Sequence, residues 1–279
     1  MGEPRRSRSN PHESLRKILG DTAPKRWEKL GNLVLFPHRS TLSSDEKILK
    51  EVADVLRVNR IGIQGEIDPG LMRKSTVELI LGKEGWVEHI ENGITFGFDV
   101  TKVMFSSGNV SERIRIAKID MRGEIVVDAY SGIGYYTLPM LVHSNAKFVH
   151  ACEINPESID SLRWNLNENG VQDRCTIHEG DNSETMKKLE GIADRVHLGL
   201  IPSSELSWQN AVNCLKDGCG IIHVHMNHNL KEHNLEKWVE IILDKFSKIS
   251  GKKCIAINVT KVKWYAPHIR HVVVDLQVG

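Results

Sequence analysis

The sequence is short of cysteine, of long apolar runs and of net charge, and each shortage excludes a class of protein. The five cysteines are odd in number and form no C-x-x-C pair, which argues against a disulfide framework, a zinc ribbon and a thioredoxin-like redox motif. No apolar run approaches a membrane span, and residues 1–10 carry arginines without the apolar segment of a signal peptide. We therefore expect a cytoplasmic protein with reduced thiols and no membrane association.

The formal net charge of +1 hides a basic excess at the front of the chain. Residues 1–30 hold eight Lys/Arg against four Asp/Glu, whereas the rest of the chain holds 29 against 32. Such a segment could contact nucleic-acid phosphates, because cationic side chains gain affinity by releasing condensed counterions. A solvated tail is the alternative. The side chains concerned are Arg5, Arg6, Arg8, Arg16, Lys17, Lys25 and Arg26.

The length of 279 residues predicts one large domain with a smaller companion. Short mixed elements are expected in the first third: strands at 33–36 and 60–63, and a helix from about 44 to 56. Around Asn92-Gly93 two alternating apolar stretches indicate a hairpin, because this dipeptide accepts the positive φ angles of a type I′ turn. We place the boundary there, with an α+β domain over residues 1–90.

From Glu124 onward, apolar runs alternate with helical stretches, which predicts crossover connections and a mainly parallel sheet. Pro156 and Gly170 fit the start and the end of a helix over residues 158–169. Ser203 or Ser204 is expected to cap a later helix that Gly218 ends. The expected strands are 125–129, 148–152, 175–178, 196–201, 221–225, 255–259 and 272–276. Residues 91–279 are thus predicted to form an α/β, Rossmann-like domain.

The main cofactor signal runs from Val126 to Gly134, where an apolar strand ends in Asp128 and a glycine-rich bend. Glycines at Gly132 and Gly134 let the backbone approach a ligand closely. A dinucleotide site would place a third glycine where this chain has Thr137. A phosphate-free ligand is therefore favoured over NAD.

Acidic and amide side chains end the next two predicted strands. Glu153, 25 positions after Asp128, can accept both hydroxyls of a ribose. Asp181 and Asn182 follow the third strand, where an adenine amino group and ring nitrogen would lie. Each of these alone is more often a turn or cap residue. Polar side chains at the ends of three successive strands, of which Asp128 ends the first, favour S-adenosylmethionine as the cofactor.

The chain resembles the superfamily of tRNA guanine-N1-methyltransferases and wybutosine-synthesising aminocarboxypropyltransferases over nearly its whole length. The fold this implies is that of a Rossmann-like class I S-adenosylmethionine-dependent transferase with a smaller N-terminal α+β domain. The guanine methyltransferases generally carry an Asn-Leu-Pro or Asn-Pro-Pro motif after the fourth strand, whereas this chain has residues 199–205 as GLIPSSE, which resembles the wybutosine branch. The other matching stretches are residues 91–94, 105–109 with 112–113, 128–134, 153–156, 265–268 and 271–276.

The resemblance implies that the aminocarboxypropyl group is transferred to a tricyclic guanosine derivative 3′ of the anticodon of tRNA-Phe. It also implies that Ser106 and Arg113 hold the methionine part of the cofactor, with Ser107 as a near alternative to Ser106. A bidentate guanidinium suits a carboxylate, although Arg113 could instead be a surface partner of Glu112 or of a neighbouring helix acid. The full set of expected cofactor-binding residues is Ser106, Arg113, Asp128, Tyr130, Gly132, Glu153, Asp181 and Asn182.

Other interpretations stay open at this point. A guanine-N1-methyltransferase would use the same fold, and a non-catalytic tRNA-binding protein could keep it without turnover; the N-terminal domain is a possible tRNA contact in each case. No proton acceptor can be chosen among His178, Glu205 and His268. The remaining histidines at 223, 225, 228 and 233 are expected at sheet edges and not in a metal site, and the aromatic residues at 130, 135, 136, 264 and 265 are expected in the core, in the active site or on bases.

Overall fold

The computed structural model describes residues 10–66, 70, 72 and 74–279, in two units. The N-terminal unit runs to Ile90 and also includes Phe96–Phe105, and the C-terminal unit consists of Glu91–Thr95 and Ser106–Gly279. Among the described residues, no helix has the length and apolarity that crossing a membrane requires.

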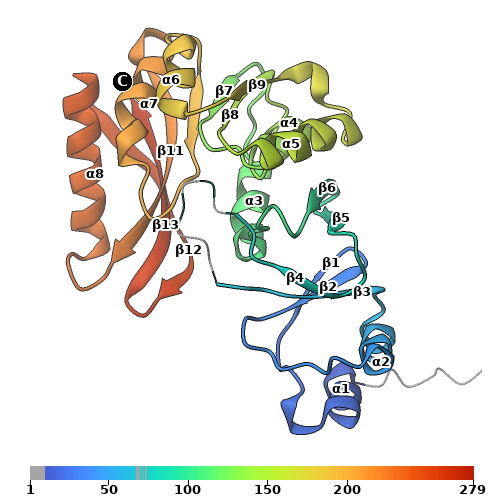
Figure 1. Ribbon diagram of the computed structural model, residues 1–279. Helices are drawn as coiled ribbons and strands as arrows, with labels where there is room; N and C mark the ends of the chain where they lie inside the picture. Colours follow the sequence, from blue (N-terminus) through green and yellow to red (C-terminus); the bar gives the residue numbers. More distant parts are fainter. Residues whose placement is uncertain (1–9, 67–69, 71, 73) are drawn as a thin grey trace, which may run out of the picture. The chain divides into compact units, whose positions relative to one another are not determined.

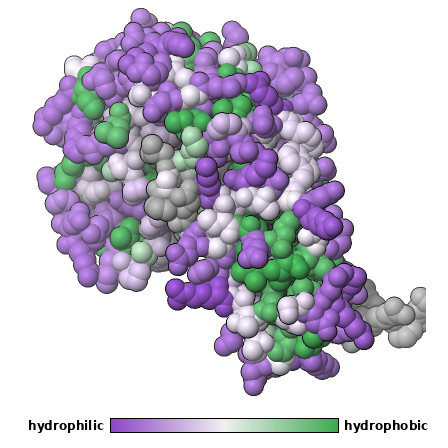
Figure 2. All heavy atoms as spheres, viewed as in Figure 1, coloured by the Kyte–Doolittle hydropathy of each residue, from purple (hydrophilic) through white to green (hydrophobic). Residues whose placement is uncertain are grey.

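The N-terminal unit is built on a four-stranded sheet in the order β1-β2-β3-β4 (Figure 1). The strands β2 and β3 are parallel and the other two pairs are antiparallel. Two amphipathic helices supply the apolar partner of this sheet, through Leu15 of α1 and through Leu49 and Val52 of α2. Figure 2 shows apolar side chains gathered over the sheet of this unit. The elements are α1 (Pro11–Leu19), η1 (Gly20–Thr22), β1 (Glu28–Leu30), β2 (Leu33–Phe36), α2 (Glu46–Leu56), β3 (Arg60–Ile63) and β4 (Glu78–Leu81).

The hairpin β5 (Trp86–Glu91) and β6 (Ile94–Asp99) confirms the predicted turn. Asn92 and Gly93 have φ angles of 49° and 75°, as a type I′ turn requires. Of the basic residues at the front, Arg5, Arg6 and Arg8 lie outside the described part. The others, Arg16, Lys17, Lys25 and Arg26, are exposed, and their contact with phosphates stays a prediction.

The C-terminal unit holds a seven-stranded sheet in the order β12-β13-β11-β10-β7-β8-β9. The five strands from β11 to β9 are parallel, and β13 runs antiparallel to both of its neighbours. The predicted Rossmann-like α/β fold is therefore confirmed. Since the chain moves from β7 to β8 on one side and later to β10 on the other, the switch point lies at the carboxyl end of β7, where such sheets bind ligands.

Helices cover both faces of this sheet (Figure 1). One face packs Val196, Ile222 and Val224 against Trp208 of α7 and Phe246 of α8. The elements of the unit are η2 (Ser107–Asn109), α3 (Val110–Ala117), β7 (Ile125–Asp128), α4 (Thr137–Val142), β8 (Phe148–Glu153), α5 (Pro156–Glu168), η3 (Gln172–Arg174), β9 (Cys175–Glu179), α6 (Asn182–Thr185), η4 (Met186–Leu189), β10 (Arg195–Leu198), η5 (Glu205–Ser207), α7 (Trp208–Cys214), η6 (Lys216–Gly218), β11 (Gly220–Asn229), α8 (Leu235–Ser250), β12 (Cys254–Ala266) and β13 (Ile269–Val278).

Two local predictions are wrong. The helix after β10 is not capped by Ser203 or Ser204, because the 3-10 turn η5 intervenes and Ser207 precedes α7. The Ser204 hydroxyl instead accepts a hydrogen bond from the Trp208 indole at 3.2 Å. Gly218 ends η6 and not the helix. The start of α5 at Pro156, with Asn155 as its N-cap, agrees with the prediction.

Candidate functional site

The glycine-rich bend after β7 is held by two acidic residues from adjacent strands. Asp128 is fully buried, and its carboxylate accepts a hydrogen bond from the Thr137 hydroxyl at 2.7 Å. One oxygen of the Glu153 carboxylate accepts from the Gly132 amide at 2.7 Å. Asp128 therefore fixes Thr137, where the bend leads into α4. Glu153 fixes the bend itself through Gly132, from the adjacent strand.

Gly132 and Gly134 are required by the shape of this bend. Their φ angles of 55° and 98° lie in the region that favours glycine. A Cβ on Gly132 would lie 2.7 Å from the Tyr135 ring, and one on Gly134 would lie 2.9 Å from a methyl of Leu162. The backbone thus passes closely under Tyr135, where a side chain would not fit.

Glu153, the last residue of β8, is partly buried at the switch point. Its second carboxylate oxygen accepts from the Asn155 amide at 2.8 Å. Burial raises the pKa of Glu153, and these backbone hydrogen bonds lower it, with a net increase. Each carboxylate oxygen accepts up to two hydrogen bonds, so the geometry leaves capacity for the two hydroxyls of a ribose.

Asp181 and Asn182 follow β9, but their surroundings differ. The Asn182 amide donates to the Ala129 carbonyl at 3.0 Å, and its oxygen lies 3.4 Å from the Ser207 hydroxyl. Ser207 also contacts the Tyr130 hydroxyl at 2.7 Å. Asp181 is exposed and caps α6, and its hydrogen bonds to Ser183 lower its pKa. Asn182 and Tyr130 are thus joined to the bend, while the hydrogen bonds of Asp181 go to its own helix α6.

Arg113 has an acid partner that the sequence did not indicate. Its guanidinium makes two hydrogen bonds to the Glu91 carboxylate, both at 2.6 Å, and a third to the Ser106 carbonyl at 2.9 Å. It also lies 5.7 Å from the centre of the Tyr135 ring. Arg113 therefore orders the turn at Ser106 and links it to the glycine bend. Its acidic partner Glu91 ends a strand and not a helix, and the contact of Arg113 with the methionine part of a cofactor stays a prediction.

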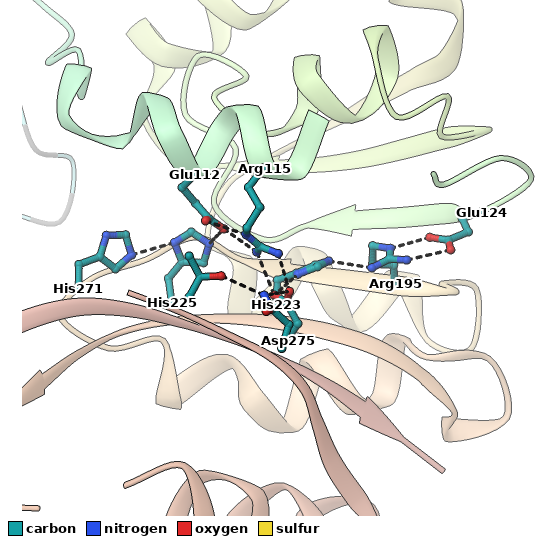
Figure 3. A network of polar contacts seen from close by, with 10 residues as sticks. Glu112, Arg115, Glu124, Arg195, His223, His225, His271 and Asp275 are labelled. Atoms are coloured by element: carbon teal, nitrogen blue, oxygen red, sulfur yellow. Dashed lines mark hydrogen bonds and ion pairs between the residues drawn. The ribbon is translucent and has the colours of Figure 1, made fainter. Parts of the chain in front are cut away.

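A buried polar network lies between α3 and the central strands (Figure 3). Arg115 makes ion pairs with both Glu112 and Asp275, and the His223 ring lies between Asp275 and Arg195. Because Arg195 only donates, it fixes the neutral His223 tautomer with the proton on Nδ1, which donates to Asp275 at 2.6 Å. The network makes the face of the sheet toward α3 polar, opposite the apolar face under α7 and α8.

Burial and charge set the protonation states in this network. Burial lowers the pKa of His223 to about 4, against the effect of Asp275, and burial together with Lys263 lowers the pKa of His271 to about 4. Burial would raise the pKa of Asp275, but His223 and Arg115 hold it well below its usual range. Asp275 is thus held as a carboxylate between the neutral His223 ring and the charged Arg115.

The expectation that the histidines lie at sheet edges is wrong for His223, His225 and His228, because β11 lies inside the sheet and all three are buried. His233 is exposed and lies outside the sheet. His197 lies beside Asp128 in the adjacent strand and packs against Tyr136, with ring centres 4.1 Å apart. Tyr136 is therefore a core residue, whereas Tyr135 lies over the bend. Among the described residues, no three His, Cys, Asp or Glu side chains are placed to hold a metal ion.

The expected cofactor-binding residues thus fall into two connected groups. The first surrounds the glycine bend and comprises Asp128, Tyr130, Gly132, Glu153 and Asn182, with Asp181 at its rim; the second comprises Ser106 and Arg113. Tyr135 joins the two groups. Sequence reasoning gave no role to Glu91, Ser207 or Lys263, although Glu91 lies in a stretch that matches the superfamily.

Comparisons with known proteins agree with this arrangement. A family model described as the TRM5/TYW2 methyltransferase domain matches residues 87–257, and one described as the TYW2 N-terminal domain matches residues 12–85. A protein of Oryza sativa subsp. japonica named tRNA wybutosine-synthesizing protein 2/3/4 is 46% identical over 271 residues. The match covers 93% of this chain and 25% of the rice protein, so the chain spans about a quarter of the length of that relative.

Two solved structures share the fold over most of their length. The structure of P. horikoshii TYW2 in complex with MeSAdo has a TM-score of 0.80 and 34% sequence identity, and the match covers 98% of this chain and 99% of that one. The structure of M. jannaschii TYW2 in complex with AdoMet has a TM-score of 0.71 and 29% identity, covering 90% of this chain and 98% of that one.

Proposed function

Because the chain belongs to the TRM5/TYW2 family, we propose that it transfers the 3-amino-3-carboxypropyl group of S-adenosylmethionine to a tRNA base. The acceptor would be a tricyclic wyosine-type guanosine next to the anticodon of tRNA-Phe, and the by-product 5′-methylthioadenosine. The observation that separates this activity from methyl transfer is the match of residues 12–85 to the TYW2 N-terminal domain. MeSAdo, the ligand of the P. horikoshii relative, is what S-adenosylmethionine becomes on losing this group.

The residues at the carboxyl edge of the sheet fit such a ligand. Glu153 presents a carboxylate, with its oxygens oriented by two backbone amides, to a ribose diol. Asn182 and Asp181 lie at the end of the next strand for the adenine. Thr137 occupies the position of the third glycine that lets the helix of a dinucleotide site pack closely on its strand. We accordingly retain all eight predicted residues as the proposed cofactor site, with Asp128 acting through the bend that it anchors.

Orientation would decide which carbon next to the sulfonium reacts. When bound, S-adenosylmethionine supplies a sulfonium-activated γ-carbon, and the acceptor supplies an electron-rich ring carbon. Holding the reacting atoms in line is worth roughly 7 to 11 kcal/mol. The chain contributes through the turn at Ser106, which Arg113 holds from its carbonyl. The S–Cγ bond breaks as the new C–C bond forms, and the neutral leaving group needs no proton. The proton that the alkylated ring carbon then releases passes to water, and we assign no general base.

The hairpin of β12 and β13 offers a surface for the RNA. Trp264 and Tyr265 are 57% and 52% exposed, and the Arg270 guanidinium lies 5.0 Å from the centre of the Trp264 ring. Exposed aromatic rings beside cationic groups stack on unpaired bases. These residues support an acceptor in a single-stranded loop, such as that of the anticodon.

The test is incubation of the protein with tRNA-Phe that carries the tricyclic intermediate and with labelled S-adenosylmethionine. Mass spectrometry of the nucleosides should show the mass of an added aminocarboxypropyl group, with methylthioadenosine in the supernatant. A methyl group on guanosine with S-adenosylhomocysteine would establish the methyltransferase alternative instead. Binding of tRNA without either product would indicate a non-catalytic tRNA-binding protein.

A further inference from the structure

Lys263 of β12 directs its ammonium group to the turn that precedes α3. A Cβ on Gly108 would lie 2.5 Å from Lys263 Nζ, so the ammonium lies directly against the backbone of η2. The side chain is partly buried. Within the described residues, no acceptor forms a hydrogen bond or ion pair with this ammonium. A partly desolvated cation is thus held in place without an anion.

The Lys263 ammonium has a second cation in its neighbourhood, the Arg113 guanidinium. Burial and the nearby charge of Arg113 both lower the pKa of Lys263. The Glu91 carboxylate is engaged by two nitrogens of Arg113. A ligand carboxylate beside the Lys263 ammonium would supply the missing negative charge, because an opposite charge at short range favours the charged ammonium.

Contacts connect this position to the glycine bend. The Tyr135 ring lies against Gly132, the Arg113 guanidinium lies over that ring, and Arg113 donates to the Ser106 carbonyl. The turn at Ser106 leads into η2, whose Gly108 lies against the Lys263 ammonium. A nucleoside at the bend would therefore extend its amino-acid end along this line toward the ammonium.

We propose that Lys263 binds the carboxylate of the aminocarboxypropyl chain of S-adenosylmethionine. The inference rests on the proposed function and assigns to Lys263 the ionic contact that the sequence suggested for Arg113. Arg113, already paired with Glu91, shapes the turn. The ammonium fixes the far end of the chain, and with it the direction that the γ-carbon presents to the acceptor base.

The test is calorimetric binding of three ligands: S-adenosylmethionine, its decarboxylated form, and methylthioadenosine. For Lys263→Met we expect the affinity for S-adenosylmethionine to fall about 10- to 150-fold, the usual range for a charged hydrogen bond. Affinities for the other two ligands, which lack the carboxylate, should stay within about twofold. Lys263→Arg should restore part of the loss. Lys261→Met, an exposed lysine on the same strand, is the matched control and should change none of the three.

Three results would overturn the inference. Equal losses for all three ligands would indicate a structural role, which thermal unfolding of the variant would also reveal. Unchanged binding of S-adenosylmethionine with weaker binding of tRNA would place Lys263 on an RNA phosphate. Failure of the wild-type chain to bind S-adenosylmethionine would reject the proposed function as well, whereas normal wild-type transfer with an unaffected Lys263→Met variant would reject this inference alone.

Discussion

Arg113 and Glu91 form a two-point ion pair, with both N–O distances 2.6 Å and the side chains only 2% and 9% exposed. The pair joins α3 to the tip of the hairpin formed by β5 and β6. In so buried a place each charge depends on the other, because neither could recover its hydration if its partner were removed.

We therefore predict that Glu91→Ala lowers the free energy of unfolding by about 3–5 kcal/mol, the usual cost of breaking a buried ion pair from one side. Urea unfolding followed by circular dichroism measures this value. The control is Asp120→Ala, which breaks the exposed pair with Arg122 and should cost less than about 1 kcal/mol. Similar losses for both variants would refute the special role of the buried pair.

Glu153→Ala should weaken binding of S-adenosylmethionine by roughly 1.5 to 3 kcal/mol, which is about 10- to 150-fold, because it removes the proposed acceptor of the ribose hydroxyls. Titration calorimetry gives the dissociation constant. Glu179→Ala, at the exposed end of the adjacent strand β9, is the matched control. An unchanged constant for Glu153→Ala would reject the ribose assignment.

Gly132→Ala should abolish measurable cofactor binding, whereas Gly170→Ala should leave it unchanged. Both glycines have positive φ angles, 55° and 67°, so both alanines carry similar backbone strain of about 1–2 kcal/mol. Only at Gly132 would the new methyl meet a side chain, the Tyr135 ring; nothing lies within 4 Å at Gly170. Calorimetry on both variants separates the effect of the ring contact from that of strain.

Acid should destabilise the protein between about pH 6.5 and 4. Burial lowers the pKa values of His223 and His271 to about 4 in the folded state, against about 6.5 in the unfolded chain. The unfolded chain therefore binds more protons in this window, and stability, complete above pH 6.5, is lost as the pH falls.

Each of these histidines should contribute a slope of up to about 1.4 kcal/mol per pH unit. Urea unfolding at pH values from 7.5 to 4.5 gives the slope. The exposed His233 serves as the control, since His233→Gln should leave the slope unchanged, while His271→Gln should reduce it. A stability independent of pH over this range would contradict the neutral states assigned to the network.

Much of the fold follows from local patterns. The Asn92-Gly93 turn, the Pro156 helix start and the apolar runs of the inner strands each depend on neighbouring residues, and the structure has them where the patterns predict. Three strands of the larger sheet were predicted too short: the inner strands β11 and β13 and the edge strand β12. β12 continues to Ala266 through Lys261 and Lys263, because an edge strand pairs on one side only and tolerates charged side chains that interrupt an apolar run.

Less of the candidate site than of the fold could be predicted from the sequence. The acids at the strand ends could be found because parallel strands bring their carboxyl ends to one edge. The partner of Arg113 lies 22 positions away, across a turn and a strand, and no periodicity relates the two. The histidines of β11 alternate with Ile222 and Val224, a signal of one polar face, but only the packing of α3 shows that this face is buried.

The division of the chain within the hairpin determines where the gene can be truncated. The tip, Glu91–Thr95, clusters with the C-terminal unit, although the ten residues that follow belong with the N-terminal one. A fragment starting at Ser106 would lack Glu91 and leave a buried guanidinium without its counter-ion, so it should be recovered mainly as aggregate. A truncation upstream of Trp86 is safer, because the fragment then keeps the whole hairpin, including Glu91, which neutralises Arg113 of α3.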